Sequence, residues 1–156
     1  MNSLAKIDAQ VIKTTKILGI PFARLAIFVV YFWFGILKLV GSSPANPLVD
    51  ALLAQTLPFI TFSQFIIILG VFEMIIGVAF LIPRLERLAI FLLIPHLFVT
   101  IMPLILLPGM TWQSTFIPTL EGQYIIKNIL IIAVALGLAA HIEPMHPRHP
   151  ELTRKS

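Results

Sequence analysis

The sequence contains no cysteine and few charged residues for its length. Without cysteine, the chain by itself cannot form a disulfide, supply a thiolate metal ligand or carry out thiol redox chemistry. Charged residues make up 12% of the 156 residues, whereas they make up about a quarter of an ordinary soluble domain. Hydrophobic residues make up 58%. So few polar side chains cannot cover the surface of a soluble protein, and the composition therefore indicates a membrane protein.

Four long hydrophobic stretches follow one another along the chain, at residues 20–40, 63–82, 88–107 and 122–140. Each is close to the length of about 20 residues at which an α-helix crosses a bilayer. The sequence therefore predicts an all-α fold, an integral membrane four-helix bundle over residues 20–140. The stretch 48–57 follows the helix-start signal Asn46-Pro47 and ends before Pro58, which predicts a short interfacial helix.

Lysine and arginine are absent from two links between spans, residues 41–62 and 108–121. Basic residues lie instead beside the first span, in the link between the second and third spans, and in the tail: Lys6, Lys13, Lys16, Arg24, Arg84, Arg87, Arg148, Arg154 and Lys155. Because cytoplasmic loops carry the excess of Lys and Arg, both termini are expected in the cytoplasm. This orientation explains the net charge of +4 without a nucleic-acid partner.

The two ends of the chain differ in pattern. In the leader, residues 1–19, apolar and basic side chains fall on opposite sides of a helix with about 100° per residue. The apolar side holds Leu4, Ile7, Val11 and Leu18, and the basic side holds Lys6, Lys13 and Lys16. The leader is expected to be a helix on the inner membrane surface, or alternatively a frayed basic segment. The tail, residues 141–156, is expected to be extended, and its prolines oppose a metal site at its histidines, His141, His146 and His149.

Glu73 is the only charged residue in the hydrophobic run 65–82. A carboxylate near the middle of a span costs about 2.5 to 3.5 kcal/mol on insertion scales, so it requires a partner or a proton. His96 lies at a similar depth in the third span, while Lys38 and Lys127 lie in the outer halves of the first and fourth. We therefore expect a polar spot in the outer half of the membrane, with Lys127 as a partner of Glu73.

Polar and small residues form one stripe on each predicted span. In the second span, Gly70, Glu73 and Gly77 share one face, where glycine permits close helix approach. The other stripes are Tyr31, Gly35 and Lys38; His96, Thr100 and Pro103; and Tyr124, Lys127 and Asn128. Facing inward, they form a pocket whose candidate ligand-binding residues are Glu73, Lys127, Lys38, His96, Tyr31, Asn128 and Tyr124, with Gly35, Gly70 and Gly77 as helix-packing residues. No catalytic residue and no metal ligand is assigned.

Each polar residue also has a purely structural interpretation. Lys38 and Lys127 are long enough to reach the outer headgroups by snorkelling. His96 is close to Pro95 and Pro103, each of which frees a backbone carbonyl that a neutral imidazole can bond. Glu73 can act as a staple that joins helices through a bond to Lys127 or Tyr31. The sequence does not decide between these interpretations and a binding pocket.

Three segments together resemble a known family. They are RLAIFVVYFWFGILKL, in which a helix-opening arginine precedes GxxK; FEMIIGVAFLIP, in which a glycine follows the glutamate; and GQYIIKNILIIAVAL, with a lysine–asparagine pair. In this order, over residues 20–140, the chain resembles the DoxX-like family of small four-span membrane proteins. The resemblance is strongest to the branch that includes the reactive-chlorine-resistance inner-membrane protein. The positions that match the family pattern are Arg24, Gly35, Lys38, Glu73, Gly77, Lys127 and Asn128.

The resemblance implies a multi-pass protein of a bacterial-type inner (plasma) membrane. It also implies an accessory subunit or companion of a quinone-linked redox or oxidative-stress system, with quinone as the implied cofactor. The alternatives are a non-catalytic assembly module of a membrane complex and a small proton or solute transporter that works as an oligomer. The expected partners are the lipid bilayer and either a membrane redox complex or further copies of the chain. The isolated chain is not expected to be an enzyme.

Overall fold

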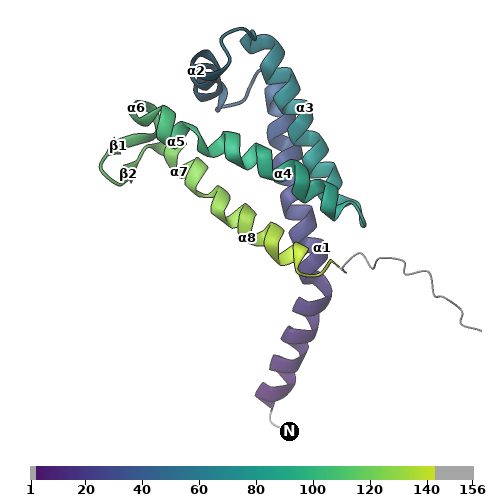
Figure 1. The fold of residues 1–156 in the computed structure, drawn as a ribbon. Coiled ribbons are helices and arrows are strands. Elements are labelled where there is room, and N and C mark those ends of the chain that lie inside the picture. Colours follow the sequence, from purple (N-terminus) through teal and green to yellow (C-terminus); the bar gives the residue numbers. More distant parts are fainter. Residues whose placement is uncertain (1–2, 143–156) are drawn as a thin grey trace, which may run out of the picture.

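The computed structural model describes residues 3–142, which are mainly helical (Figure 1). The helices are α1 (Ser3–Leu39), α2 (Asn46–Thr56), α3 (Phe62–Leu81), α4 (Glu86–Ile101), α5 (Pro103–Leu106), α6 (Pro108–Thr111), α7 (Leu120–Ile126) and α8 (Asn128–Ala139). Two short strands, β1 (Trp112–Ser114) and β2 (Ile117–Pro118), form an antiparallel hairpin. Most of the tail, including His146 and His149, lies outside the described residues.

Four segments are long and apolar enough to cross a membrane, which confirms the predicted all-α, four-span architecture. They are Ser3–Leu39, Phe62–Leu81, Glu86–Leu106 and Leu120–Ala139. Their ends lie within one or two residues of the predicted ends, except at the start of the first segment. Many of their large apolar side chains are not covered by protein, so these helices contact the lipid bilayer.

The first helix is longer than the sequence indicated. The leader is helical, but it continues into the first span without a break, so α1 has 37 residues. At about 1.5 Å per residue such a helix is about 55 Å long, against about 30 Å of hydrocarbon in a bilayer. Pro21 lies inside α1, and the N-terminal part of the helix extends beyond the other helices (Figure 1). A separate leader helix is therefore not what the structure has.

The contact between α1 and α3 is the most extensive helix contact in the described structure. At its centre, a Cβ atom built on Gly35 would lie 2.6 Å from the Gly70 carbonyl oxygen and 2.6 Å from Met74 Cγ. A Cβ on Gly70 would lie 2.9 Å from the Gly35 carbonyl oxygen. Two turns further along α3, a Cβ on Gly77 would meet the backbone of Phe32 at 3.1 Å. The three glycines therefore permit two antiparallel backbones to touch, which no side chain at these positions would allow.

The remaining two spans complete the bundle around one apolar core. A tight turn at residues 82–85, with Arg84 at φ 77°, joins α3 to α4 and makes them antiparallel neighbours. The core draws side chains from α1, α3, α4 and α8: Ile27, Tyr31, Ile76, Ala79, Phe80, Ala89, Leu93, Leu97, Ala135 and Leu138. Ile76 and Phe80 are completely buried. This core holds the four helices together on the cytoplasmic side of Glu73, in the predicted orientation.

At the other end of the bundle, α2, α5, α6 and the hairpin form a cap (Figure 1). The helix α2 begins and ends close to the predicted bounds, whereas the hairpin and the breaks after α4 and α5 were not predicted. Pro108 has no N–H for the Leu104 carbonyl, and the Trp112 indole donates to that oxygen instead, at 2.9 Å. The Thr111 hydroxyl donates to the carbonyl oxygen of Leu107 at 3.0 Å. The Trp112 side chain thus replaces a helical hydrogen bond that Pro108 removes, while the Thr111 hydroxyl adds a bond to a carbonyl that already accepts from the backbone.

Candidate functional site

The polar centre of the bundle is an ion pair between α1 and α3. Lys38 Nζ donates to Glu73 Oε2 at 2.6 Å, and both side chains are less than a tenth exposed. Glu73 Oε1 lies 3.0 Å from Nε2 of His96, which α4 contributes. Both carboxylate oxygens therefore have a partner, and three helices meet at one side chain. This satisfies the requirement for a partner that the position of Glu73 imposes in a bilayer.

His96 extends the network away from the carboxylate. Its Nδ1 atom lies 3.3 Å from the hydroxyl oxygen of Tyr31 and 3.4 Å from that of Thr100. The Thr100 hydroxyl also donates to the His96 carbonyl oxygen at 2.8 Å. A neutral imidazole donates at one nitrogen and accepts at the other, so when Nε2–H donates to Glu73, Nδ1 accepts from Tyr31 or Thr100. Lysine, carboxylate, imidazole and phenol thus form one hydrogen-bonded chain, and Thr100 is a member that the predicted pocket did not include.

Aromatic rings cover the imidazole on two sides. The Tyr31 ring meets the His96 ring edge-on, with centroids 5.1 Å apart. The Phe72 ring lies tilted to it at 6.3 Å. These rings restrict the imidazole to the orientation in which both nitrogens reach their partners. His96 is therefore held by side chains, and its hydrogen bonds do not depend on a carbonyl freed by Pro95 or Pro103.

Lys38 reaches Glu73 because the glycine contact brings α1 and α3 together. Gly35 is one turn before Lys38, and Gly70 is one turn before Glu73, so the backbone contact lies directly beside the ion pair. Lys38 lies in the last turn of α1, where snorkelling to the outer headgroups was the alternative. Its side chain is buried instead, with its ammonium group on the carboxylate. The partner of Glu73 in the fold is therefore Lys38, and the expected pairing with Lys127 is wrong.

The stripe on the fourth span faces outward, contrary to the predicted arrangement of four inward stripes. Tyr124 is 59% exposed and Lys127 is exposed, while Asn128 is half-buried. Lys127 Nζ lies over the Tyr124 ring, 5.2 Å from its centroid. Because Tyr124 is one turn nearer the end of the span, this contact directs the lysine toward the membrane edge, as snorkelling requires. The two residues at the bundle surface, Lys127 and Tyr124, are therefore separate from the buried chain.

A second ion pair, which the sequence reasoning missed, lies at the opposite end of the bundle. Arg24 of α1 donates to Glu86 at the start of α4, and both side chains are mostly buried. The sequence held a signal for it. Arg24 opens the first span and Glu86 is the one acidic residue in the link 83–87, so the predicted orientation places both at the same membrane face. The pair ties α1 to α4 where the turn between α3 and α4 brings Glu86 close.

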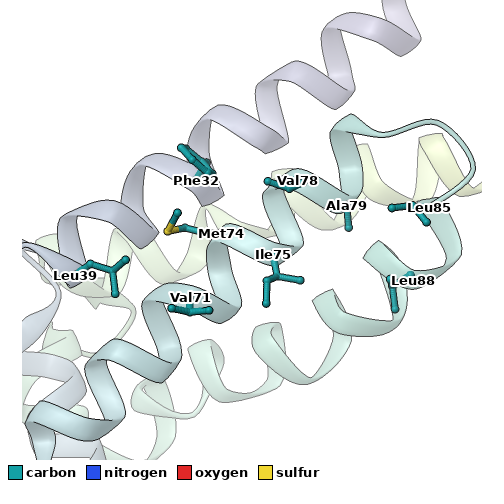
Figure 2. Close-up of a pocket in the computed structure, with 9 residues that line it drawn as sticks. All are labelled: Phe32, Leu39, Val71, Met74, Ile75, Val78, Ala79, Leu85 and Leu88. Atoms are coloured by element: carbon teal, nitrogen blue, oxygen red, sulfur yellow. The ribbon is translucent and has the colours of Figure 1, made fainter.

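Two grooves on the surface of the described structure are apolar and separate from the ion pair. One groove of about 380 Å³ runs along α3, with walls from Phe32 and Leu39 of α1 and from Leu85 and Leu88 at the start of α4 (Figure 2). Its lining includes Met74, Ile75 and Val78 of α3 (Figure 2). Such a groove is suited to a lipid acyl chain. It contributes no polar group to the site.

Within residues 3–142, no group of three or more histidine, aspartate and glutamate side chains is placed to hold a metal ion. Of the tail histidines, only His141 is described, and its Nδ1 lies 2.8 Å from the Gly137 carbonyl oxygen at the end of α8. The comparisons with known proteins add no identity, because no family model, no curated protein and no solved structure matches the chain. Fold and site together define a four-span helical membrane protein with a buried, ion-paired hydrogen-bond chain.

Proposed function

We propose that this chain is a DoxX-like companion of a quinone-linked redox or oxidative-stress system in a bacterial-type inner membrane, and that it binds a quinone head group at His96 and Tyr31. One observation carries the proposal. His96 stands between a buried carboxylate, 3.0 Å from Nε2, and a buried phenol, 3.3 Å from Nδ1. Ionisable residues linked in this way inside a membrane are costly, and they commonly mark ligand sites and proton relays.

The chemistry of the network fits a quinone carbonyl. A quinone oxygen accepts hydrogen bonds, and the Tyr31 hydroxyl is a donor whose acceptor in the network is His96 Nδ1. The single proton of the Thr100 hydroxyl goes to the His96 carbonyl oxygen at 2.8 Å, and this hydroxyl is able to turn to Nδ1 when Tyr31 turns to a ligand oxygen. Reduction of the quinone takes two electrons and two protons. In this proposal the redox partner supplies the electrons, and the chain binds the head group and passes protons along His96 and Glu73.

An apolar groove beside the network offers a place for the quinone tail. It has a volume of about 330 Å³ and is lined by Ile67, Ile68, Val71, Phe72 and Ile75. Phe72 belongs both to this groove and to the aromatic surroundings of His96, since its ring centroid lies 6.3 Å from that of the imidazole. A rotation of the Phe72 side chain would open a path from the groove to His96. Small-molecule sites in proteins typically combine such apolar walls with few polar groups.

The test is recovery of quinone with the protein. The chain, purified from membranes in mild detergent, is extracted with organic solvent, and bound quinone is measured by mass spectrometry. We expect quinone with the wild type and with Lys127→Met, whose lysine lies outside the network, and a several-fold loss with His96→Leu. Thermal melts check that His96→Leu is folded. Equal recovery from all three proteins, or no quinone from the wild type, contradicts the proposal.

A second candidate is a non-catalytic interaction module, in which the network only holds helices together. It is favoured by the complete pairing of Glu73, since both of its oxygens are bonded to side chains from other helices. Glu73→Gln separates the two functions, because glutamine keeps an acceptor but cannot exchange a proton. A variant that melts normally yet fails to restore a deletion strain supports the redox companion. Full restoration supports the interaction module.

The proposed membrane orientation, with both termini in the cytoplasm, has its own test. Because the chain has no cysteine, single cysteines report on sidedness without background. Ser42 and Ser114 are exposed in the links that lack lysine and arginine, and Ser3 is exposed at the start of α1. An impermeant thiol reagent added to intact cells is expected to label Ser42→Cys and Ser114→Cys but not Ser3→Cys. The reverse pattern would overturn the orientation.

A further inference from the structure

The first half of α1 has no partner in the described structure. Residues 3–19, here called the N-terminal arm, are exposed without exception, and they extend beyond the other helices (Figure 1). A Cβ atom added at Gly19 would meet no other atom within 4 Å. An isolated helix of this length has only marginal stability in water. The arm becomes more stable when another helix or a membrane surface covers its apolar side chains. Identifying that partner therefore bears on the function of the protein.

Five side chains of the arm form a line along the helix. Leu4, Ile7, Val11 and Leu18 follow the alternating spacing of three and four residues, and Thr14 fills the remaining position. Leu4 is 79% exposed, Val11 58% and Leu18 56%. This spacing is that of the a and d positions of a coiled coil. Two further exposed apolar residues, Ile12 and Ile17, lie beside this line at positions b and g.

No charged residue of the arm lies on this line. Lys6, Lys13 and Lys16 fall at positions c and f, on the opposite side of the helix. The positions that flank the line are e and g, and they hold Asp8 and Thr15, and Gln10 and Ile17. In a parallel pairing, g of one helix meets the following e of its neighbour, so Gln10 meets Thr15 and no like charges oppose each other. The pattern is compatible with the arm of another copy.

We propose that the N-terminal arms of several copies of this chain join in a short parallel coiled coil, with Leu4, Ile7, Val11, Thr14 and Leu18 at its centre. The membrane provides the alignment. All copies insert in the same orientation, and α1 is unbroken from the arm to the first span, so the arms leave the bilayer in parallel and in register. Leucine at a with isoleucine at d favours more than two strands.

The membrane also compensates for the shortness of the coiled coil. The arm is shorter than the roughly three to four heptads by which a coiled coil is identified from sequence alone. Two copies held in one bilayer meet at a high effective concentration, which adds to weak contacts without any new interaction. The inner membrane surface is the competing occupant, but an arm lying on it would have to turn away from the first span near Gly19 and Pro21, whereas α1 is one uninterrupted helix from Ser3 to Leu39.

Disulfide cross-linking of the full chain in membranes tests the proposal, since the cysteine-free sequence provides a clean background. Val11 and Ile12 are adjacent, exposed and β-branched, but only Val11 lies on the apolar line. On mild oxidation we expect Val11→Cys to form several-fold more disulfide dimer than Ile12→Cys. Equal cross-linking at both positions, as in random collisions, overturns the proposal. So does an uncross-linked Val11→Cys that an aqueous maleimide cannot reach, which is the result expected for an arm buried in the membrane surface.

Subunit counting provides an independent measurement. Val11→Asp places a charge on the line, whereas the matched variant Ile12→Asp places it beside the line. Because both residues lie outside the bundle, both variants are expected to melt as the wild type does. In native lipid particles, Val11→Asp is expected to shift the population to monomers, while Ile12→Asp keeps the oligomer. An unchanged oligomer in Val11→Asp would show that the arm does not hold the copies together.

Discussion

Two lysines, Lys38 and Lys127, both lie on membrane spans, yet their environments differ. Lys38 is buried and bonded to Glu73 at 2.6 Å. Lys127 is exposed over the ring of Tyr124. Both are flanked by apolar residues in the sequence. The difference in burial between the two lysines therefore comes from how closely a neighbouring helix packs beside each of them, and not from the local sequence.

Only at Lys38 does a neighbouring helix pack closely enough to bury the lysine side chain. Gly35 and Gly70 bring the backbones of α1 and α3 into contact, and Glu73 lies one turn further along α3. The lysine then reaches a carboxylate without crossing a gap. Around Lys127, α7 ends and α8 begins, and the helix surface there is uncovered. A lysine at an uncovered surface reaches more polar surroundings by extending along the helix.

The strongest test of this comparison is Glu73→Ala. Removal of the carboxylate leaves Lys38 buried without its ion-pair partner, which typically costs about 3 to 5 kcal/mol in the free energy of unfolding. Lys38→Ala is expected to cost less, because Glu73 keeps its bond to His96. Thermal melts in detergent measure both. If Glu73→Ala melts at the wild-type temperature, the ion pair does not support the bundle.

Gly35→Ala tests whether the close contact between α1 and α3 is what allows Lys38 to be buried. Gly35→Ala places a Cβ atom 2.6 Å from the Gly70 carbonyl oxygen, so α1 and α3 must separate. Overpacking of this kind costs about 1 to 3 kcal/mol. Gly137→Ala in α8 is the matched control, because its Cβ meets no atom within 4 Å. Equal melting temperatures of the two variants would mean that the glycine contact is dispensable.

A double variant measures whether Lys38 and Glu73 act as a pair. Lys38→Met combined with Glu73→Gln removes both charges together and is expected to lose less stability than the sum of the single losses. Coupling between contacting residues is about 0.5 to 3 kcal/mol in unfolding free energy. Lys127→Met combined with Glu73→Gln is expected to be additive, since Lys127 is outside the network. Coupling in the second pair, or its absence in the first, would reverse the assignment of partners.

The smallest effect is expected at the surface lysine. Lys127→Met removes a cation–π contact with Tyr124, which is worth about 0.5 to 1 kcal/mol at an exposed position. The same melts detect it, with Glu73→Ala as the reference for a buried charge. A loss as large as that of Glu73→Ala would indicate that Lys127 is covered, for example by a partner protein in the membrane.

Much of the fold was predictable from the sequence, because lipid imposes a simple rule. A segment that crosses a bilayer must be apolar and must satisfy its backbone hydrogen bonds internally, so runs of hydrophobic residues locate the helices directly. The span ends and the short helix α2 followed from such signals. The hairpin at β1 and β2 did not, because its residues 112–118 carry no alternating apolar pattern and are held by contacts across the cap.

The site was predictable only in part. The helical periodicity of the sequence placed Tyr31, Gly35 and Lys38 on one face of α1, and all three are buried in the structure. The same reasoning grouped Tyr124, Lys127 and Asn128 on one face of the last span but could not tell which way that face turns. A helical period gives the residues on a stripe, whereas the rotation of the helix depends on how tightly its neighbours pack. Ligand binding by the candidate residues stays a prediction.

The sequence by itself determined that this protein is a four-span helical membrane protein, and that Glu73 requires a partner inside the bilayer. These conclusions follow from hydrophobic length and from the cost of a charge in hydrocarbon, which are local properties of the chain. Only the tertiary structure decided that the partners are Lys38 and His96, that Lys127 stays at the surface, and that the leader continues α1. Partner choice depends on which helices touch and at what rotation, and that is decided by packing between residues far apart in the sequence.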